Sequence, residues 1–183
     1  MTALETERLL LRPWNPRDID ALASVFGHRA VWEFPFGRAF TREETERFLE
    51  RQVQHWERHG FGLWAAELKA EGTLIGFVGL AVPTWLPAVL PAVEVGWRLQ
   101  PDQWGRGLAT EGGRASLRHG FDTLRLDRII SIFMPDNVAS GRVMDKLGMR
   151  TFTTTEDPNL GVPLEVREIT RSAWRAKENG PTT

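Results

Sequence analysis

The stretch Trp104-Gly105-Arg106-Gly107-Leu108-Ala109-Thr110-Glu111 follows an apolar run typical of a strand and opens a segment with helical spacing. Successive backbone N–H groups in a glycine turn at a helix start form a cradle for an anion. The helix dipole adds about half a positive charge there. Gly105 and Gly107 lack Cβ atoms, so phosphate oxygens can approach the backbone amides closely. Taken alone, the same two glycines also fit a simple turn before a helix.

The common phosphate-binding loops differ from this stretch. A Walker-type loop requires a Lys-Ser/Thr pair after the second glycine, and neither the pair nor the glycine spacing is present. A dinucleotide fingerprint requires a small residue three positions after its second glycine, where this chain has Thr110.

The stretch resembles the coenzyme A loop of the GNAT N-acetyltransferases, whose pattern is Arg/Gln-x-x-Gly-x-Gly/Ala. Gly107 and Ala109 occupy the small positions, and Trp104 stands where the general pattern has Arg or Gln. A second block, residues 137–149, reads Asn-Val-Ala-Ser-Gly-Arg-Val-Met-Asp-Lys-Leu-Gly-Met. It is similar to a block of the Rim-type ribosomal-protein N-terminal acetyltransferases and their small-molecule relatives, a subfamily that commonly carries an aromatic residue at the Trp104 position.

Further stretches extend the resemblance over nearly the whole chain. Residues 7–13 resemble the first strand of the family, residues 94–99 its fourth strand, and residues 169–174 its end. The resemblance implies a single α/β domain over residues 1–183 with its core at about 7–174. The implied GNAT fold is a twisted, mixed, mostly antiparallel sheet of about seven strands. Helices cover both faces, and the sheet is splayed between the fourth and fifth strands.

Periodicity and turn residues predict the same alternation of strands and helices. The predicted strands are 8–12, 63–68, 73–80, 93–99, 128–133, 150–155 and 164–170. The predicted helices are 16–26, one that begins at the capping-box sequence 41–44 and ends near Gly60, 108–121 and 139–147. Residues 179–183 are expected to be a frayed tail. Gly112 and Gly113, inside a predicted helix, indicate close packing of that helix on the sheet.

Composition excludes several classes of protein. The 183 residues carry a formal net charge of −1, which gives no electrostatic reason to expect nucleic-acid binding. The chain has no cysteine, so disulfides and a cysteinyl acyl-enzyme are excluded. No membrane span or signal peptide is expected, and the cytoplasm is the expected location.

The resemblance implies acetyl transfer from acetyl-CoA to a primary amine, with a protein N-terminal α-amine slightly favoured. The alternatives are a small-molecule amine acceptor (an antibiotic, a polyamine or an amino acid), another acyl group, a non-catalytic CoA-binding module and a pure interaction protein. An α-amine with a pKa of about 8 loses its proton more readily than a lysine amine with a pKa of about 10.4, so an N-terminal acceptor can work with a weak base.

The expected cofactor contacts come from three segments. The strand 95–99 is expected to pair with the pantetheine arm, and one of its N–H groups to polarise the thioester. The candidate binding residues are Val95, Trp97, Leu99, Trp104, Gly105, Arg106, Gly107, Leu108, Ala109, Thr110, Asn137, Ser140 and Arg142. No metal is expected.

The catalytic candidates are Ser140, Glu94 and Glu33. Many family members use a tyrosine to assist the leaving thiol, but this chain has no Tyr, and Ser140 is the expected substitute. Asn137 has two interpretations, a ligand of the pantetheine arm or a helix cap. Glu94 is the first candidate for the base and Glu33 the second, although either can be a structural or solvated carboxylate.

Aromatic residues crowd the segment between the first two predicted helices. Trp32, Phe34 and Phe36 are expected to line the acceptor pocket, although most such rings belong to the core of a protein. His55 and His59 share a helix face without a third ligand and are expected at the surface. The apolar loop 83–91, if exposed, is expected to form a substrate wall or a partner surface, of which a homodimer is the simplest case.

Overall fold

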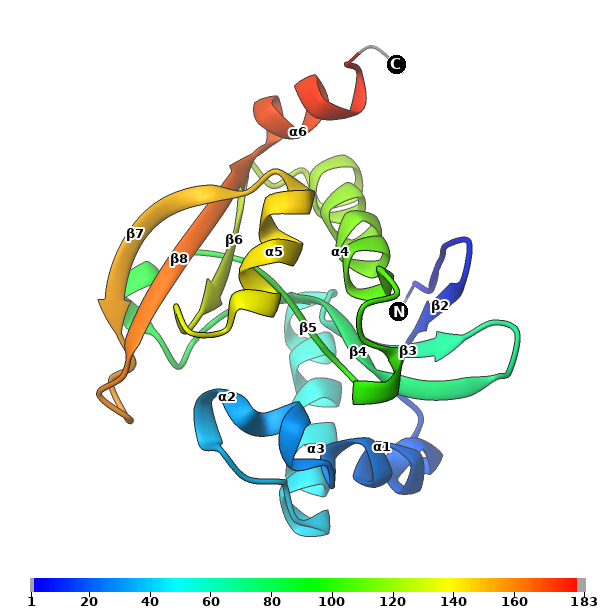
Figure 1. The fold of residues 1–183 in the computed structure, drawn as a ribbon. Coiled ribbons are helices and arrows are strands. Elements are labelled where there is room, and N and C mark those ends of the chain that lie inside the picture. Colours follow the sequence, from blue (N-terminus) through cyan, green and yellow to red (C-terminus); the bar gives the residue numbers. More distant parts are fainter. Residues whose placement is uncertain (1, 181–183) are drawn as a thin grey trace.

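The computed structural model describes residues 2–180, and within them the chain forms a mixed sheet in the order β1-β2-β3-β4-β5-β6-β8-β7 (Figure 1). All neighbouring strands are antiparallel except β5 and β6, which run parallel. The strands are β1 (Leu4–Glu5), β2 (Leu9–Arg12), β3 (Leu63–Leu68), β4 (Thr73–Ala81), β5 (Glu94–Leu99), β6 (Arg128–Phe133), β7 (Arg150–Glu156) and β8 (Pro163–Thr170). The expected α/β fold is confirmed. The short strand β1 is an addition to the expected set, so the predicted splay falls between β5 and β6.

Six α-helices connect or follow these strands within residues 2–180. They are α1 (Ile19–Phe26), α2 (Glu33–Phe36), α3 (Arg42–His59), α4 (Leu108–Arg118), α5 (Val138–Leu147) and α6 (Arg171–Glu178). The predicted helix 108–121 changes after Arg118 into a π-helical turn, His119–Thr123. The sequence pattern did not predict α2 or α6.

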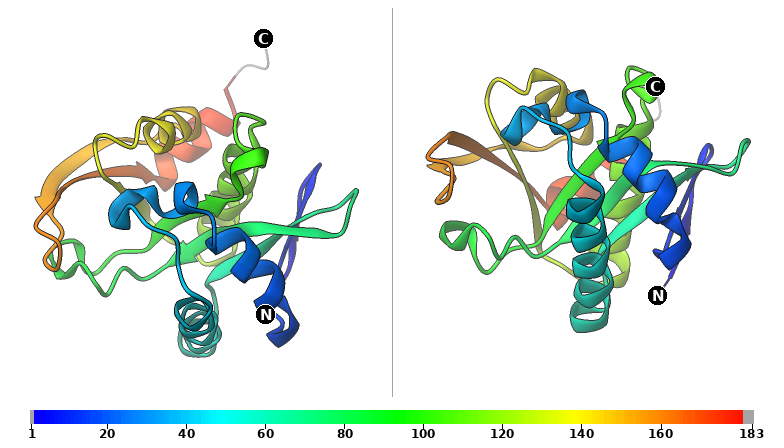
Figure 2. Two further views of the ribbon diagram at one scale, coloured as in Figure 1. Left: turned by 60° about the horizontal axis from the view of Figure 1, so that its bottom comes forward. Right: turned by 90° about the horizontal axis from the view of Figure 1, so that it is seen from below.

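The helices cover both faces of the sheet (Figure 2). On one face, Phe26 of α1 and Phe48 of α3 pack against Phe77 of β4, with ring centroids 6.2 and 5.3 Å from it. On the other face, a Cβ on Gly112 of α4 would lie only 3.1 Å from Val78, the next residue of β4. Because successive strand residues point to opposite faces, α4 lies opposite α1 and α3.

The close packing expected at the two glycines of α4 is present at both. Gly112 lies against the sheet, whereas a Cβ on Gly113 would come within 3.0 Å of Leu147 of α5. A larger residue at either position would push α4 away from its neighbours, so these glycines fix the spacing of the layers.

The capping box predicted at the start of α3 is confirmed. The Glu44 N–H donates to Thr41 Oγ1 at 3.2 Å, and the Thr41 N–H donates to Glu44 Oε2 at 2.8 Å. The helix ends at Gly60 in a left-handed conformation. The expected tail lies partly outside the described residues: residues 181–183 are not described, and Asn179 caps α6.

The apolar loop 83–91 is only partly exposed. Leu86 and Val89 are buried with Ile130, Leu164 and Val166 in a small core beneath β6 and β8. Trp85 and Leu90 remain about two-fifths exposed, at 40% and 39%. The loop therefore meets only in part the condition of exposure under which a substrate wall or partner surface was expected, because its middle covers the sheet beside the splay. Among the described helices, none is both long and apolar enough to cross a membrane.

Candidate functional site

The strands β5 and β6 are joined at one end only. Glu94 pairs with Ile130, and the Ile130 N–H donates to the Val93 carbonyl at 2.9 Å. The Ser131 hydroxyl, which is buried, donates to the Val95 carbonyl at 2.8 Å. No further pair joins the two strands within the described chain, and β5 and β6 diverge away from this end (Figure 1).

Within residues 2–180, the backbone N–H and C=O of Trp97 have no partner and face this opening. The even-numbered residues of β5 direct their N–H and C=O groups toward β4, so the odd-numbered ones face β6. The Val95 carbonyl is taken by Ser131, and the Leu99 carbonyl accepts from Trp104 Nε1 at 2.7 Å. Of the three candidates on this strand, Trp97 is therefore the one whose N–H and C=O are both available to an added extended chain.

The loop before α4 has the geometry of an anion cradle. Gly105 and Gly107 have φ angles of 73° and 82°, which residues with a Cβ rarely adopt. None of the backbone N–H groups of residues 105–110 donates to a protein acceptor within residues 2–180. The first intrahelical bond runs from Glu111 N–H to Gly107 C=O. Free amides at a helix start favour a bound anion.

The side chains around the loop differ in exposure. Trp104 is 50% exposed although its indole N–H is bonded, and Leu108 is buried and anchors α4. The Arg106 guanidinium donates to Gln103 and remains exposed. Ala109 and Thr110 are half-buried in the first turn of α4.

The start of α5 contains the second predicted block. Asn137 Oδ1 accepts from the Ser140 N–H at 3.1 Å, so the capping interpretation of Asn137 holds in the structure. The bond uses the backbone of Ser140, and its half-buried hydroxyl forms no hydrogen bond within the described part of the chain. Arg142 is exposed on the same helix.

Glu94, Gly96 and Arg98 alternate along β5, so they lie on one face of the sheet, opposite to the face that carries the side chains of Val95, Trp97 and Leu99. Burial raises the pKa of Glu94 to about 7, and a hydrogen bond with Trp85 acts in the opposite direction. Nothing lies within 4 Å of where a Gly96 Cβ would be, so open space adjoins the strand between the two charged residues. A carboxyl with a pKa near neutrality can accept a proton from an amine at physiological pH.

Arg98 anchors the aromatic segment to β5. Its guanidinium donates to the Val31 carbonyl and, at 2.8 Å, to the Phe34 carbonyl. Its guanidinium carbon lies 3.9 Å from the centre of the Trp32 ring. Burial lowers the pKa of Arg98 to about 10, so it stays charged at neutral pH. Arg98 was not among the residues predicted from the sequence, although an arginine inside a predicted strand was a visible signal.

The predicted acceptor residues occupy different environments. Trp32 is 5% exposed and stacks on Phe40 with ring centroids 3.6 Å apart, so it belongs to the core. Phe34 is half-buried, and Phe36 is 44% exposed. Glu33 is exposed and pairs with Arg29 at 3.4 Å.

The histidines of α3 are half-buried rather than at the surface as expected. His55 and His59 have ring centroids 4.5 Å apart. Burial, followed by the neighbouring charges of His59 and Arg58, lowers the pKa of His55 to about 4. Within residues 2–180, no group of three His, Asp or Glu side chains is arranged to hold a metal ion.

Comparison with known proteins identifies the family. The profile of the family described as "Acetyltransferase (GNAT) domain" matches residues 8–150, which is most of the chain. The chain therefore belongs to the GNAT acetyltransferases and is an N-acetyltransferase. Members of this family take their acetyl group from acetyl-CoA.

Individual relatives agree with this assignment. The FsC-acetyl coenzyme A-N(2)-transacetylase of Aspergillus fumigatus is 34% identical over 162 residues, covering 76% of this chain and 63% of that protein. A GNAT-family acetyltransferase structure from Bacillus anthracis has a TM-score of 0.77 and 25% identity, covering 93% and 99% of the two chains. The ribosomal-protein-S5-alanine acetyltransferase of Vibrio fischeri has a TM-score of 0.76 at 20% identity, covering 95% and 99%, and shares the fold.

Proposed function

We propose that this enzyme transfers the acetyl group of acetyl-CoA to a primary amine in the opening between β5 and β6. The observation that carries the proposal is that two sets of free backbone groups border this opening. They are the N–H and C=O of Trp97 on β5 and the amides of residues 105–110 at the start of α4. The Trp97 N–H fits the carbonyl of the thioester, the Trp97 C=O fits an amide N–H of the pantetheine arm, and the amides of residues 105–110 fit a pyrophosphate.

The residues of the chain divide the chemistry between them. Acetyl-CoA supplies an activated acyl group as a thioester. The Trp97 N–H polarises the thioester carbonyl, and the Ser140 hydroxyl, which has no partner within residues 2–180, donates to the departing sulfur. Glu94, with a pKa of about 7, accepts the proton of the attacking amine directly or through a water. Glu33 is the weaker candidate because it is exposed and paired with Arg29.

The acceptor site lies on the face of β5 that carries Glu94, Gly96 and Arg98, next to α2. Phe36 offers an exposed ring there, and Phe34 a half-buried one. We propose a protein N-terminal α-amine as the acceptor. The similarity of residues 137–149 to the Rim-type enzymes supports this choice, as does the fold shared with the Vibrio fischeri enzyme.

A small-molecule amine is the second candidate. The name of the Aspergillus fumigatus relative describes an N(2)-transacetylase. Its sequence identity to this chain, 34%, is higher than the 20% of the Vibrio fischeri enzyme. The same Glu94 can serve either acceptor, since both need only the loss of one amine proton.

Two measurements test the proposal. Calorimetric titration of the purified protein with acetyl-CoA is expected to show one binding site per chain. Release of free CoA thiol is then measured with peptides that have free N-termini, with the same peptides blocked by N-acetylation, and with polyamines, aminoglycosides and amino acids. Turnover with free but not blocked peptides supports the first acceptor class, and turnover only with small amines supports the second. Binding without turnover on any amine would indicate a CoA-binding module.

A further inference from the structure

Arg8 connects the edge of the sheet to the glycine loop. Its N–H donates to Glu111 Oε1 at 2.8 Å and its Nε donates to Glu111 Oε2 at 2.7 Å. Its Nη1 donates to the backbone carbonyl of Arg106 at 2.9 Å. Thr6 Oγ1 adds a bond to Glu111 Oε1 at 2.6 Å. One side chain near the N-terminus therefore holds both the loop and the first turn of α4.

The Glu111 carboxylate fixes the position of the Arg8 side chain. Its side chain is only 15% exposed, and donors from Thr6 and Arg8 contact both of its oxygens. Hydrogen bonds to a charged, half-buried carboxylate are stronger than those between neutral groups. The guanidinium is thereby fixed in the orientation in which its remaining nitrogen reaches Arg106.

The bond to the Arg106 carbonyl has a direct consequence for the loop. A trans peptide unit is planar, so its C=O and the following N–H point in opposite directions. With the Arg106 carbonyl turned toward Arg8, the Gly107 N–H must point away from Arg8. The glycines on both sides of Arg106 impose little conformational restraint of their own, so the peptide unit can rotate when the bond is absent.

Packing does not replace this bond. Residues 104–107 are all exposed, and nothing lies within 4 Å of where a Gly105 Cβ would be. A cavity of about 470 Å³ adjoins the loop and is lined by Thr6, Gly107 and Glu111 among others. The loop thus lies between solvent and a cavity, and within residues 2–180 the Arg8 side chain is the donor that holds the Arg106 carbonyl.

We propose that Arg8 is a positioning residue that aims the Gly107 amide, and with it the rest of the cradle, at the pyrophosphate of acetyl-CoA. The proposal rests on the proposed function of this loop. Arg8 contacts no reacting atom. It lowers the cost of binding because the loop does not have to become ordered when the ligand arrives.

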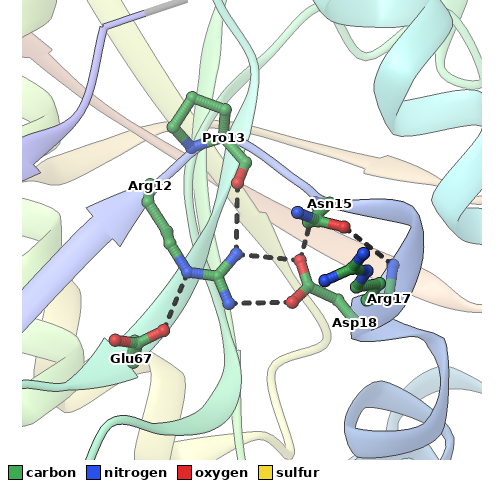
Figure 3. A network of polar contacts seen from close by, with 6 residues as sticks. All are labelled: Arg12, Pro13, Asn15, Arg17, Asp18 and Glu67. Atoms are coloured by element: carbon green, nitrogen blue, oxygen red, sulfur yellow. Dashed lines mark hydrogen bonds and ion pairs between the residues drawn. The ribbon is translucent and has the colours of Figure 1, made fainter.

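The test compares Arg8→Met and Arg8→Lys with a matched arginine in the same segment. Arg12 donates from Nη1 and Nη2 to Asp18 and from Nε to Glu67, each at 2.8 Å, in a network of similar size remote from the loop (Figure 3). Arg12→Met is therefore expected to lower the melting temperature without changing the Kd for acetyl-CoA. Both Arg8 variants are expected to raise that Kd by about tenfold, since neither side chain can hold Glu111 and the Arg106 carbonyl together.

A second readout follows the loop without ligand. In protein labelled with ¹⁵N-glycine, the Gly107 amide signal is expected to shift or broaden in the Arg8 variants and to stay unchanged in Arg12→Met. If Arg8→Met does not fold, Glu111→Gln replaces it, because the amide weakens the ion pair with little change of shape.

The outcomes separate this inference from the proposed function. Wild-type protein that fails to bind acetyl-CoA contradicts the function itself. Wild-type protein that binds, with folded Arg8 variants that bind within twofold of it, overturns the role of Arg8. Equal weakening by Arg12→Met also overturns it, since the effect would then be a general loss of stability.

Discussion

Arg98 lies over the Trp32 ring at 3.9 Å, and its guanidinium donates to the carbonyls of Val31 and Phe34. The strand beside the opening and the aromatic segment next to the proposed acceptor site are thus held together by one planar cation. Phe40 covers the opposite side of Trp32, at 3.6 Å between ring centroids.

Arg98→Lys is expected to weaken this attachment, because an ammonium group cannot stack on the ring and reach both carbonyls at once. We expect the free energy of unfolding to fall by about 1–3 kcal/mol and the KM for the amine to rise, with the Kd for acetyl-CoA unchanged. Arg29→Lys is the control, since that side chain is 72% exposed. Equal losses of affinity for both substrates would show a general packing defect instead.

Phe36 is a better probe of the proposed acceptor site than Trp32. Trp32→Ala removes a ring that is 5% exposed and is expected to cost about 3–5 kcal/mol of stability. Phe36 is 44% exposed, so Phe36→Ala is expected to change stability by less than about 0.5 kcal/mol. The KM for the amine should rise and the KM for acetyl-CoA should not. An unchanged KM for every amine that is turned over would remove Phe36 from the acceptor site.

Gly107→Val tests the anion cradle. The φ angle of 82° is strained for valine, and the side chain would crowd the amides, so the Kd for acetyl-CoA is expected to rise at least about tenfold by calorimetry. Gly72→Val introduces comparable strain at a φ of 63° in the β3–β4 turn and should leave the Kd unchanged. A folded Gly107→Val variant with wild-type affinity would exclude the loop from the cofactor site.

Glu94 is expected to give the enzyme a pH dependence near neutrality. Its pKa of about 7 means that kcat/KM for the amine should rise as pH increases through 7, and Glu94→Gln should abolish most of the activity. A pH profile of the variant that keeps the same inflection at reduced activity would assign the titration to another group.

The same raised pKa affects stability with a defined sign. Between pH 4.5 and about 7, the folded protein binds more protons at Glu94 than the unfolded chain does. This contribution to the free energy of unfolding therefore falls as pH rises through that window. In denaturant titrations, the stability of Glu94→Gln relative to wild type should increase from pH 4.5 to 7. A difference in stability between Glu94→Gln and wild type that stays constant from pH 4.5 to 7 would mean that the Glu94 carboxyl is solvated in the folded protein.

Ser140→Ala is expected to lower kcat by about tenfold to a thousandfold with little change in the Kd for acetyl-CoA, because the hydroxyl bond strengthens only as charge builds on sulfur. The melting temperature should not change, since Asn137 caps α5 through the Ser140 backbone. Asn137→Ala is the complementary variant and should cost about 1 kcal/mol of stability. Single-turnover acetylation distinguishes a real loss of chemistry from slow product release. A single-turnover rate of Ser140→Ala equal to that of the wild-type protein would exclude Ser140 from the mechanism.

Local sequence signals determined most of the regular elements and the glycine loop before α4. The capping box at Thr41, the left-handed Gly60 and the glycines around Arg106 depend on backbone conformations and bonds that neighbouring residues define. These features can be predicted from a few consecutive residues. The helices α2 and α6 were missed because α2 is a single turn and α6 has only eight residues.

The tertiary structure alone decided which side chains meet. Arg8 lies 103 positions from Glu111, and Arg98 lies 67 positions from Val31. It also decided that Trp32 is buried while Phe36 is exposed, and that the carbonyls of Val95 and Leu99 are occupied while the backbone of Trp97 is free. A hydrogen bond or a stacked ring depends on positions within a few ångströms. Those positions are set by the packing of all the layers together, and no short stretch of sequence contains that information.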